Sequence, residues 1–69
     1  MNTSDLKVLK DWLDRAGSLP DYQRDLIENA IYALETGSVS RAQDSLKTMA
    51  RNYRNNGDTN AANAVERLL

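Results

Sequence analysis

The stretch from Asp21 to Glu35, DYQRDLIENAIYALE, is the longest uninterrupted helical pattern in the chain. At ~100° per residue its apolar side chains spread over roughly half of the helical cylinder, whereas a surface helix needs a stripe only a little wider than ~100°. A helix with so broad an apolar side is covered by two neighbours, so the sequence predicts a central helix in a small all-α domain. The apolar residues are Tyr22, Leu26, Ile27, Ala30, Ile31, Ala33 and Leu34.

Apolar residues at helical spacing predict three more helices. The four predicted helices span about residues 5–16, 20–36, 39–55 and 59–69. Since Gly37-Ser38 leaves only a short link, the second and third helices should form an antiparallel hairpin. The predicted fold is a compact bundle of three to four helices with a helical hairpin. With 69 residues, the chain has room for one domain, residues 1–69.

The predicted helix ends carry stop and start signals. Gly17 and Gly37 follow the first two helices, and Asn55-Asn56-Gly57 ends the third, where a left-handed residue is common. For the third helix either Ser38 or Ser40 can be the N-cap, and Ser40 with Gln43 would complete a capping box. The remaining N-cap candidates are Asn2, Thr3 and Ser4 for the first helix and Asp58 or Thr59 for the fourth.

Trp12 is the only tryptophan, and it falls on one helical face with leucines of the first helix. We therefore expect Trp12 to be buried, so that its replacement by alanine would cost ~3–5 kcal/mol. The leucines and the alanine that share this face are Leu6, Leu9, Leu13 and Ala16.

A chain this short buries a limited core, and its hydrophobic residues include many alanines, no phenylalanine and no cysteine. Because each alanine contributes little burial energy, self-association would be a natural source of stability, and we expect a homodimer. No apolar run reaches the ~18 residues of a membrane span. Association with a membrane is therefore not expected, and a cytoplasmic location is the default.

Catalysis is not expected, because the chain has neither histidine nor cysteine, which removes most nucleophile and base pairings. The acidic residues lie along a polar helix face without the loop geometry of a calcium site. A glycine-rich phosphate-binding loop is also missing. We therefore predict no enzyme activity, no catalytic residue, no metal and no cofactor.

The polar side of the central helix carries an acidic stripe around one tyrosine. Its members recur at i, i+4, i+7, i+11 and i+14, so they lie in one line. The line is either a solvated face or a protein-binding surface with Tyr32 as its anchor, because aromatic residues are enriched at binding hot spots. The stripe consists of Asp21, Asp25, Glu28, Tyr32 and Glu35, of which Tyr32, Asp25, Glu28 and Glu35 are the predicted partner-binding residues.

A basic line on the third helix offers an alternative. Lys47, Arg51 and Arg54 recur at i, i+4 and i+7, so they could meet three phosphates of a nucleic acid or could border the core. The segment Ala33–Gly37 resembles the turn of the helix-turn-helix family. That resemblance covers about fourteen residues and departs from the family pattern at Thr36, Ser38 and Gln43, where apolar residues are usual.

Charge is distributed unevenly between the two halves of the chain. Seven acidic and four basic residues give residues 1–36 a net charge of −3, and residues 37–69 carry five basic and three acidic residues, a net +2. Such asymmetry hints at polar interaction surfaces. We therefore expect a non-catalytic interaction or regulatory module, an adaptor or inhibitor of a larger protein, similar in size to small phage and bacterial regulators. The alternative is a small DNA- or RNA-binding regulator.

Overall fold

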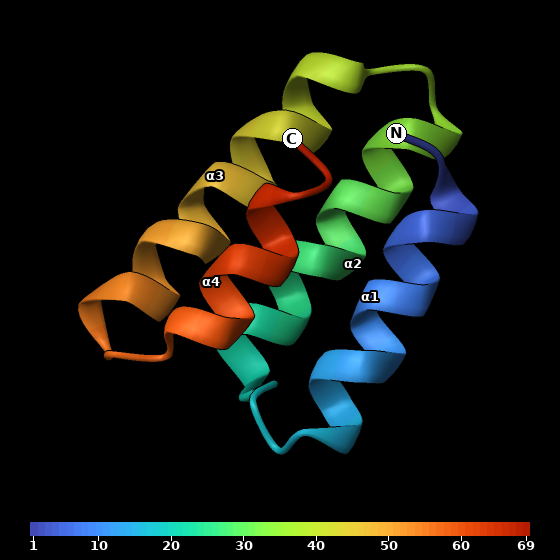
Figure 1. The fold of residues 1–69 in the computed structure, drawn as a ribbon. Coiled ribbons are helices and arrows are strands. Elements are labelled where there is room, and N and C mark those ends of the chain that lie inside the picture. Colours follow the sequence, from blue (N-terminus) through green and yellow to red (C-terminus); the bar gives the residue numbers. More distant parts are fainter.

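The computed structural model describes residues 1–69 as four α-helices without a strand. They pack as a ring, since α1 contacts α2, α2 contacts α3, α3 contacts α4, and α4 returns to contact α1 (Figure 1). The helices are α1 (Thr3–Arg15), α2 (Asp21–Glu35), α3 (Val39–Asn55) and α4 (Thr59–Glu66). The predicted all-α bundle is confirmed, and α2 and α3 form the antiparallel hairpin (Figure 1).

The predicted helix bounds need small corrections. The third helix has the predicted bounds, whereas α1 begins earlier, at Thr3, because Asn2 is its N-cap and accepts a hydrogen bond from the Asp5 N–H at 2.8 Å. Pro20 and Thr36 flank α2 instead of belonging to it. The last helix ends at Glu66 and does not continue to residue 69.

All three connections begin with the same backbone turn. At the end of α2, Gly37 has φ 86°, its N–H donates to the Leu34 carbonyl, and the Ser38 N–H donates to the Ala33 carbonyl at 2.7 Å. This pair of bonds defines a Schellman motif, which satisfies carbonyls at the helix end and requires a left-handed residue. Gly17 and Gly57 make equivalent bonds after α1 and α3, so the predicted glycine stops are confirmed.

The N-terminal caps of α3 and α4 differ. Asp58 accepts a hydrogen bond from the Ala61 N–H at 3.2 Å and caps α4 as one of the two predicted candidates. Ser38 occupies the N-cap position of α3 but makes no side-chain capping bond. The predicted capping box of Ser40 and Gln43 is wrong, because α3 already begins at Val39 and places Ser40 inside its first turn.

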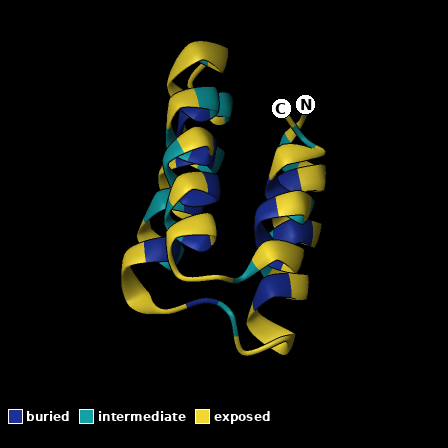
Figure 2. Ribbon diagram, turned by 60° about the vertical axis from the view of Figure 1, so that its left-hand side comes forward, coloured by how far each residue is buried: buried dark blue, intermediate teal, exposed yellow.

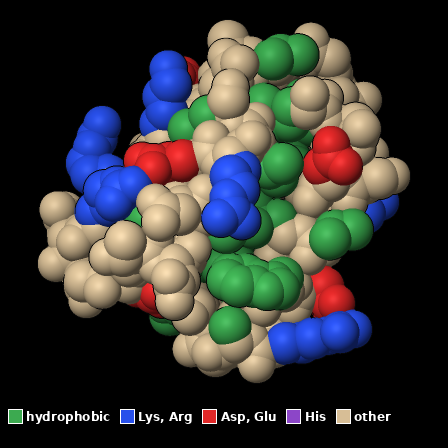
Figure 3. Space-filling model, in the orientation of Figure 1, with side chains coloured by type: hydrophobic (Ala, Val, Ile, Leu, Met, Phe, Trp, Pro, Cys, Tyr) green, Lys and Arg blue, Asp and Glu red, His purple; other side chains and the backbone are tan.

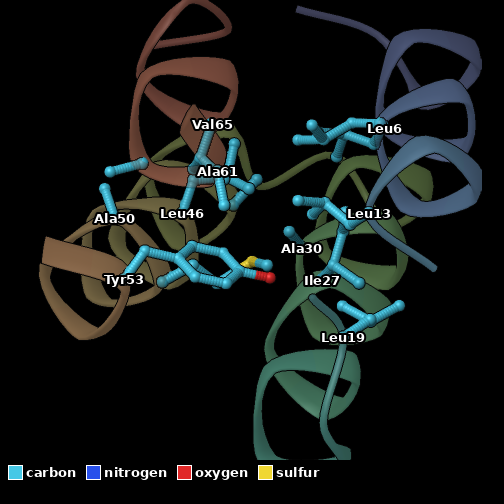
Figure 4. Packing of buried hydrophobic residues seen from close by; sticks show 14 of the residues in the cluster. Leu6, Leu13, Leu19, Ile27, Ala30, Leu46, Ala50, Tyr53, Ala61 and Val65 are labelled. Atoms are coloured by element: carbon cyan, nitrogen blue, oxygen red, sulfur yellow. The ribbon is translucent and has the colours of Figure 1, made fainter. Parts of the chain in front are cut away.

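The core fills the space that the four helices enclose. Figure 2 shows the buried positions on the inner sides of the helices, and Figure 4 shows Leu6 and Leu13 of α1 facing the side chains of α3 and α4. Six of the fifteen core residues are alanines. The core consists of Leu6, Leu9, Leu13, Leu19, Ile27, Ala30, Ala33, Ala42, Leu46, Met49, Ala50, Tyr53, Ala61, Ala62 and Val65.

Two residues that the helical pattern assigned to apolar faces lie on the surface. Trp12 is 47% exposed and Tyr22 is 49% exposed. The predicted burial of Trp12 is therefore wrong. The buried residues of α1 are all leucines, and Trp12 lies at the edge of the face that they form. At this edge the short α4 makes few contacts with α1.

The buried line of α2 contains a polar residue that the hydrophobic pattern missed. Gln23 is fully buried and lies one helical turn before Ile27. Its Nε2 donates to the Met49 carbonyl at 3.1 Å, and its Oε1 accepts from the Asn52 Nδ2 at 3.2 Å. Both polar ends of the amide are thus satisfied inside the interface between α2 and α3, where an unpaired amide would be costly.

Tyr53 ties α3 to the connection between α1 and α2. Its ring is buried and its hydroxyl donates to the Ser18 carbonyl at 2.5 Å. Burial raises the pKa of the Tyr53 phenol to about 12, with smaller contributions from Asp58 and Tyr22. The phenol is therefore held in its neutral, hydrogen-bonding form.

Replacing Gln23 by glutamate should make stability depend on pH. Burial raises the pKa of the new carboxyl in the folded state above its unfolded value of ~4.3, so the loss of stability is small below that pH and grows as the pH rises. At neutral pH we expect a loss of ~2–3 kcal/mol or more, measured by urea unfolding followed by circular dichroism. Gln23→Leu is the control, and its loss should not vary with pH. An equal loss for Gln23→Glu at acidic and neutral pH would contradict the assignment.

Replacing Tyr53 by phenylalanine should flatten the alkaline stability profile. The folded-state pKa of about 12 lies above the unfolded value, so this stabilising contribution is present below ~10 and is lost as the pH rises toward 12. Phenylalanine cannot ionise, so Tyr53→Phe should lose less stability than the wild type over that range. At neutral pH it should be less stable by ~1 kcal/mol for the missing hydrogen bond. Parallel slopes in alkaline urea titrations would count against this role.

Candidate interaction surfaces

The predicted acidic stripe lies on the outer side of α2. All five members are exposed, and the Tyr32 side chain is 68% exposed without a hydrogen-bonding partner for its hydroxyl. The helix brings the stripe together as the spacing predicted, because all its members belong to one continuous α-helix, Asp21–Glu35.

The stripe is partly neutralised by α1. Glu28 forms an ion pair with Lys10, with 2.9 Å between Oε2 and Nζ. The hydrogen bond from Lys10, together with its positive charge, lowers the pKa of Glu28. Asp25 and Glu35 form no ion pair, so the free negative charge lies on either side of Glu28 and around Tyr32.

The predicted basic line on α3 is also divided. Lys47 and Arg51 are exposed without an ion pair. Arg54 instead reaches α4, where it forms an ion pair with Glu66 and donates to the Asn63 Oδ1 at 3.0 Å. The hydrogen bond raises the pKa of Arg54 and lowers that of Glu66. Arg54 therefore connects two helices, and two of the three predicted cations remain open to a ligand.

The hairpin of α2 and α3 differs from a helix-turn-helix unit. The two helices of that motif meet at about 90–120°. Here α2 and α3 lie side by side and run in opposite directions along their lengths (Figure 1). The short turn at Gly37 that resembled the motif therefore joins a different arrangement.

An apolar groove between α1 and α4 was not predicted from the sequence. It has a volume of about 480 Å³. Figure 3 shows hydrophobic side chains gathered in a strip between these two helices. The groove is lined by Asp5, Val8, Leu9, Trp12, Asn60, Asn63, Ala64, Arg67 and Leu68. Val8 is 69% exposed, and its spacing from Trp12 by four residues is the signal in the sequence that both belong to one outer face of α1.

A second hollow lies between α1 and α2 and is polar. Ion pairs cross it, since Lys10 binds Glu28 and Arg24 binds Asp14 at 2.8 Å. The hydrogen bond to Asp14 raises the pKa of Arg24. Because these charged side chains are already paired with one another, they connect the two helices and leave few free groups that could bind a ligand.

Comparison with known proteins assigns no role to these surfaces, since no family model, curated protein or solved structure matches the chain. None of the four helices combines the length and the apolar character needed to cross a membrane. The acidic side chains nowhere gather into a group of three or more that could hold a metal ion.

The position of Trp12 can be tested by comparing two alanine variants of α1. Leu13 is fully buried, so Leu13→Ala should cost ~2–5 kcal/mol. Trp12→Ala should cost clearly less despite the larger side chain, because about half of Trp12 is already in water. Urea unfolding followed by circular dichroism in dilute protein measures both. A larger loss for Trp12→Ala than for Leu13→Ala would place the indole in the core.

Proposed function

We propose that the protein is a non-catalytic interaction module that binds a basic partner protein through the acidic stripe of α2. The observation that supports this proposal most strongly is the placement of the aromatic residues. Of the one tryptophan and three tyrosines, only Tyr53 is buried, whereas Trp12, Tyr22 and Tyr32 are exposed.

This placement is unfavourable for a small domain on its own. Aromatic side chains bury ~150–250 Å² each and contribute strongly to a core, whereas alanine contributes little. The core of this chain nevertheless relies on alanines and leaves three aromatic rings outside. Exposed aromatic residues are the usual anchors of protein interfaces, where a partner removes them from water.

Tyr32 fits the role of anchor best among the three. It is more exposed than Trp12 or Tyr22, and its hydroxyl is free, whereas the Tyr22 hydroxyl already accepts a hydrogen bond from Asn56 at 2.8 Å. The free carboxylates of Asp25 and Glu35 lie along the same helix face. They would steer a basic partner toward Tyr32, and binding would weaken with salt.

Binding of nucleic acid through α3 receives less support. If Lys47, Arg51 and Arg54 bound phosphates together, Arg54 would have to break its ion pair with Glu66 and its hydrogen bond to Asn63. The acidic stripe of the neighbouring α2 also repels phosphate. The protein-binding role is therefore the better supported of the two.

The variant Tyr32→Ala tests this function. It should fold normally, because the ring packs against little, and it should lose more than ~1 kcal/mol of partner affinity. Tagged wild type, Tyr32→Ala and Val39→Ala are each used to capture proteins from the native host lysate. Val39→Ala is the control, since it removes another exposed apolar side chain from a different surface.

The expected result is a protein retained by the wild type and by Val39→Ala, lost by Tyr32→Ala and released by salt. Identical sets from all three baits would refute the role of Tyr32. Binding of duplex DNA at physiological salt that is abolished by Lys47→Glu, Arg51→Glu and Arg54→Glu together, and unaffected by Tyr32→Ala, would instead favour the nucleic-acid alternative.

A further inference from the structure

We propose that the groove between α1 and α4 is the interface of a symmetric homodimer. In this dimer Trp12 of each copy packs into the groove of the other. This surface is separate from the Tyr32 stripe, because α2 contacts α1 and α3 but makes no contact with α4 in the ring of helices.

The groove has the composition of a protein interface. Its apolar lining includes Trp12 and Val8 of α1 with Ala64 and Leu68 from the end of the chain. Its polar lining residues are Asp5, Asn60, Asn63 and Arg67. Apolar and aromatic side chains accompanied by polar ones are typical of protein interfaces. Trp12 and Val8 are 47% and 69% exposed, so a partner can still remove much of their surface from water.

The charged residues that line the groove favour a second copy as the occupant. Asp5 lies at the beginning of α1 and Arg67 directly after α4, and neither forms an ion pair within the chain. Since α1 and α4 run in opposite directions, both chain termini lie at the same end of the molecule (Figures 1 and 2). Asp5 and Arg67 therefore lie at the same end of the groove, on its opposite walls.

A two-fold axis parallel to the groove makes this arrangement self-complementary. Rotation about this axis leaves each residue at the same height along the groove but moves it to the opposite side. As a result, α1 of one copy lies over α4 of the other. Asp5 of each copy then faces Arg67 of its partner, which gives two equivalent ion pairs. A symmetric dimer requires a surface that is complementary to itself in this way.

The available area is sufficient for such a dimer. A stable interface buries ~800 Å² per partner, roughly a fifth of the 4192 Å² that this chain exposes. A long face of a molecule measuring 32 × 20 × 20 Å offers an area of that order. The dimer would also bury the indole that the monomer leaves in water, which compensates for the alanine-rich core.

Sedimentation over a range of concentrations tests the dimer. The wild type should change from 7.7 kDa to twice that mass as concentration rises. The tryptophan emission maximum should shift to the blue over the same range, because Trp12 is the only tryptophan. Trp12→Glu should remain monomeric at all concentrations, whereas Tyr32→Ala should dimerise like the wild type.

A charge exchange tests the geometry. Asp5→Arg places arginine opposite Arg67 at both contacts, and Arg67→Asp places aspartate opposite Asp5. Each variant alone should therefore dimerise at least tenfold more weakly than the wild type while its circular dichroism stays native. An equimolar mixture of the two should form a heterodimer, since both contacts then pair opposite charges. Loss of folding cannot produce this recovery.

Three results would overturn the proposal. A 7.7 kDa species alone up to ~1 mM would exclude a dimer of useful affinity. A dimer that is unaffected by Trp12→Glu would use another face. A dimer that depends on Trp12 but not on the charges at Asp5 and Arg67, with no recovery in the mixture, would exclude the proposed two-fold axis.

Discussion

Close packing through alanine is the constraint on which the rest of this structure depends. Ala30 and Ala33 are buried on α2, Ala42 and Ala50 on α3, and Ala61 and Ala62 on α4. Small side chains let helix backbones approach closely, but each removes little apolar surface from water. The fold therefore combines a tightly packed interior with a small hydrophobic driving force, and specific polar contacts gain importance.

Two such contacts fix the relative positions of helices and connections that apolar burial alone would not fix. The Gln23 amide joins α2 to α3 through the Met49 carbonyl and the Asn52 side chain. The Tyr53 hydroxyl holds the Ser18 carbonyl and thereby fixes the connection after α1. Both groups are buried, so each would cost more if it lost its partner than it contributes when paired. They define one register of the helices where alanine surfaces alone would tolerate sliding.

Local signals in the sequence predicted the elements of this fold, because the helix ends are determined by neighbouring residues. Gly17, Gly37 and Gly57 each occupy a left-handed position that the sequence identified. Trp12 and Gln23 show where this reasoning fails. Periodicity finds an apolar face, but the neighbouring helices decide which edge of that face is covered, and α4 is too short to cover Trp12. Gln23 continues the buried line of Ile27 although its polar side chain suggested the opposite face.

The same limit applies to the candidate surfaces, because features within one helix were predictable and features that depend on two helices were not. The stripe around Tyr32 lies on one helix, so its spacing was enough to place it. The pairing of Glu28 with Lys10 and of Arg54 with Glu66 depends on how two helices lie against each other, and no pattern within one helix contains that information. The groove between α1 and α4 joins the two ends of the chain, residues that are the farthest apart in sequence, and was missed for the same reason.

The two proposed surfaces reinforce each other because they lie on different sides of the ring. A dimer formed through α1 and α4 leaves the outer face of α2 open in both copies and presents two Tyr32 stripes on one particle. A partner with two basic sites, or a polymer of such sites, would then bind with an avidity above the affinity of either stripe. Because dimerisation would also bury Trp12 and stabilise the fold by mass action, the concentration of the chain would control both its stability and its binding strength.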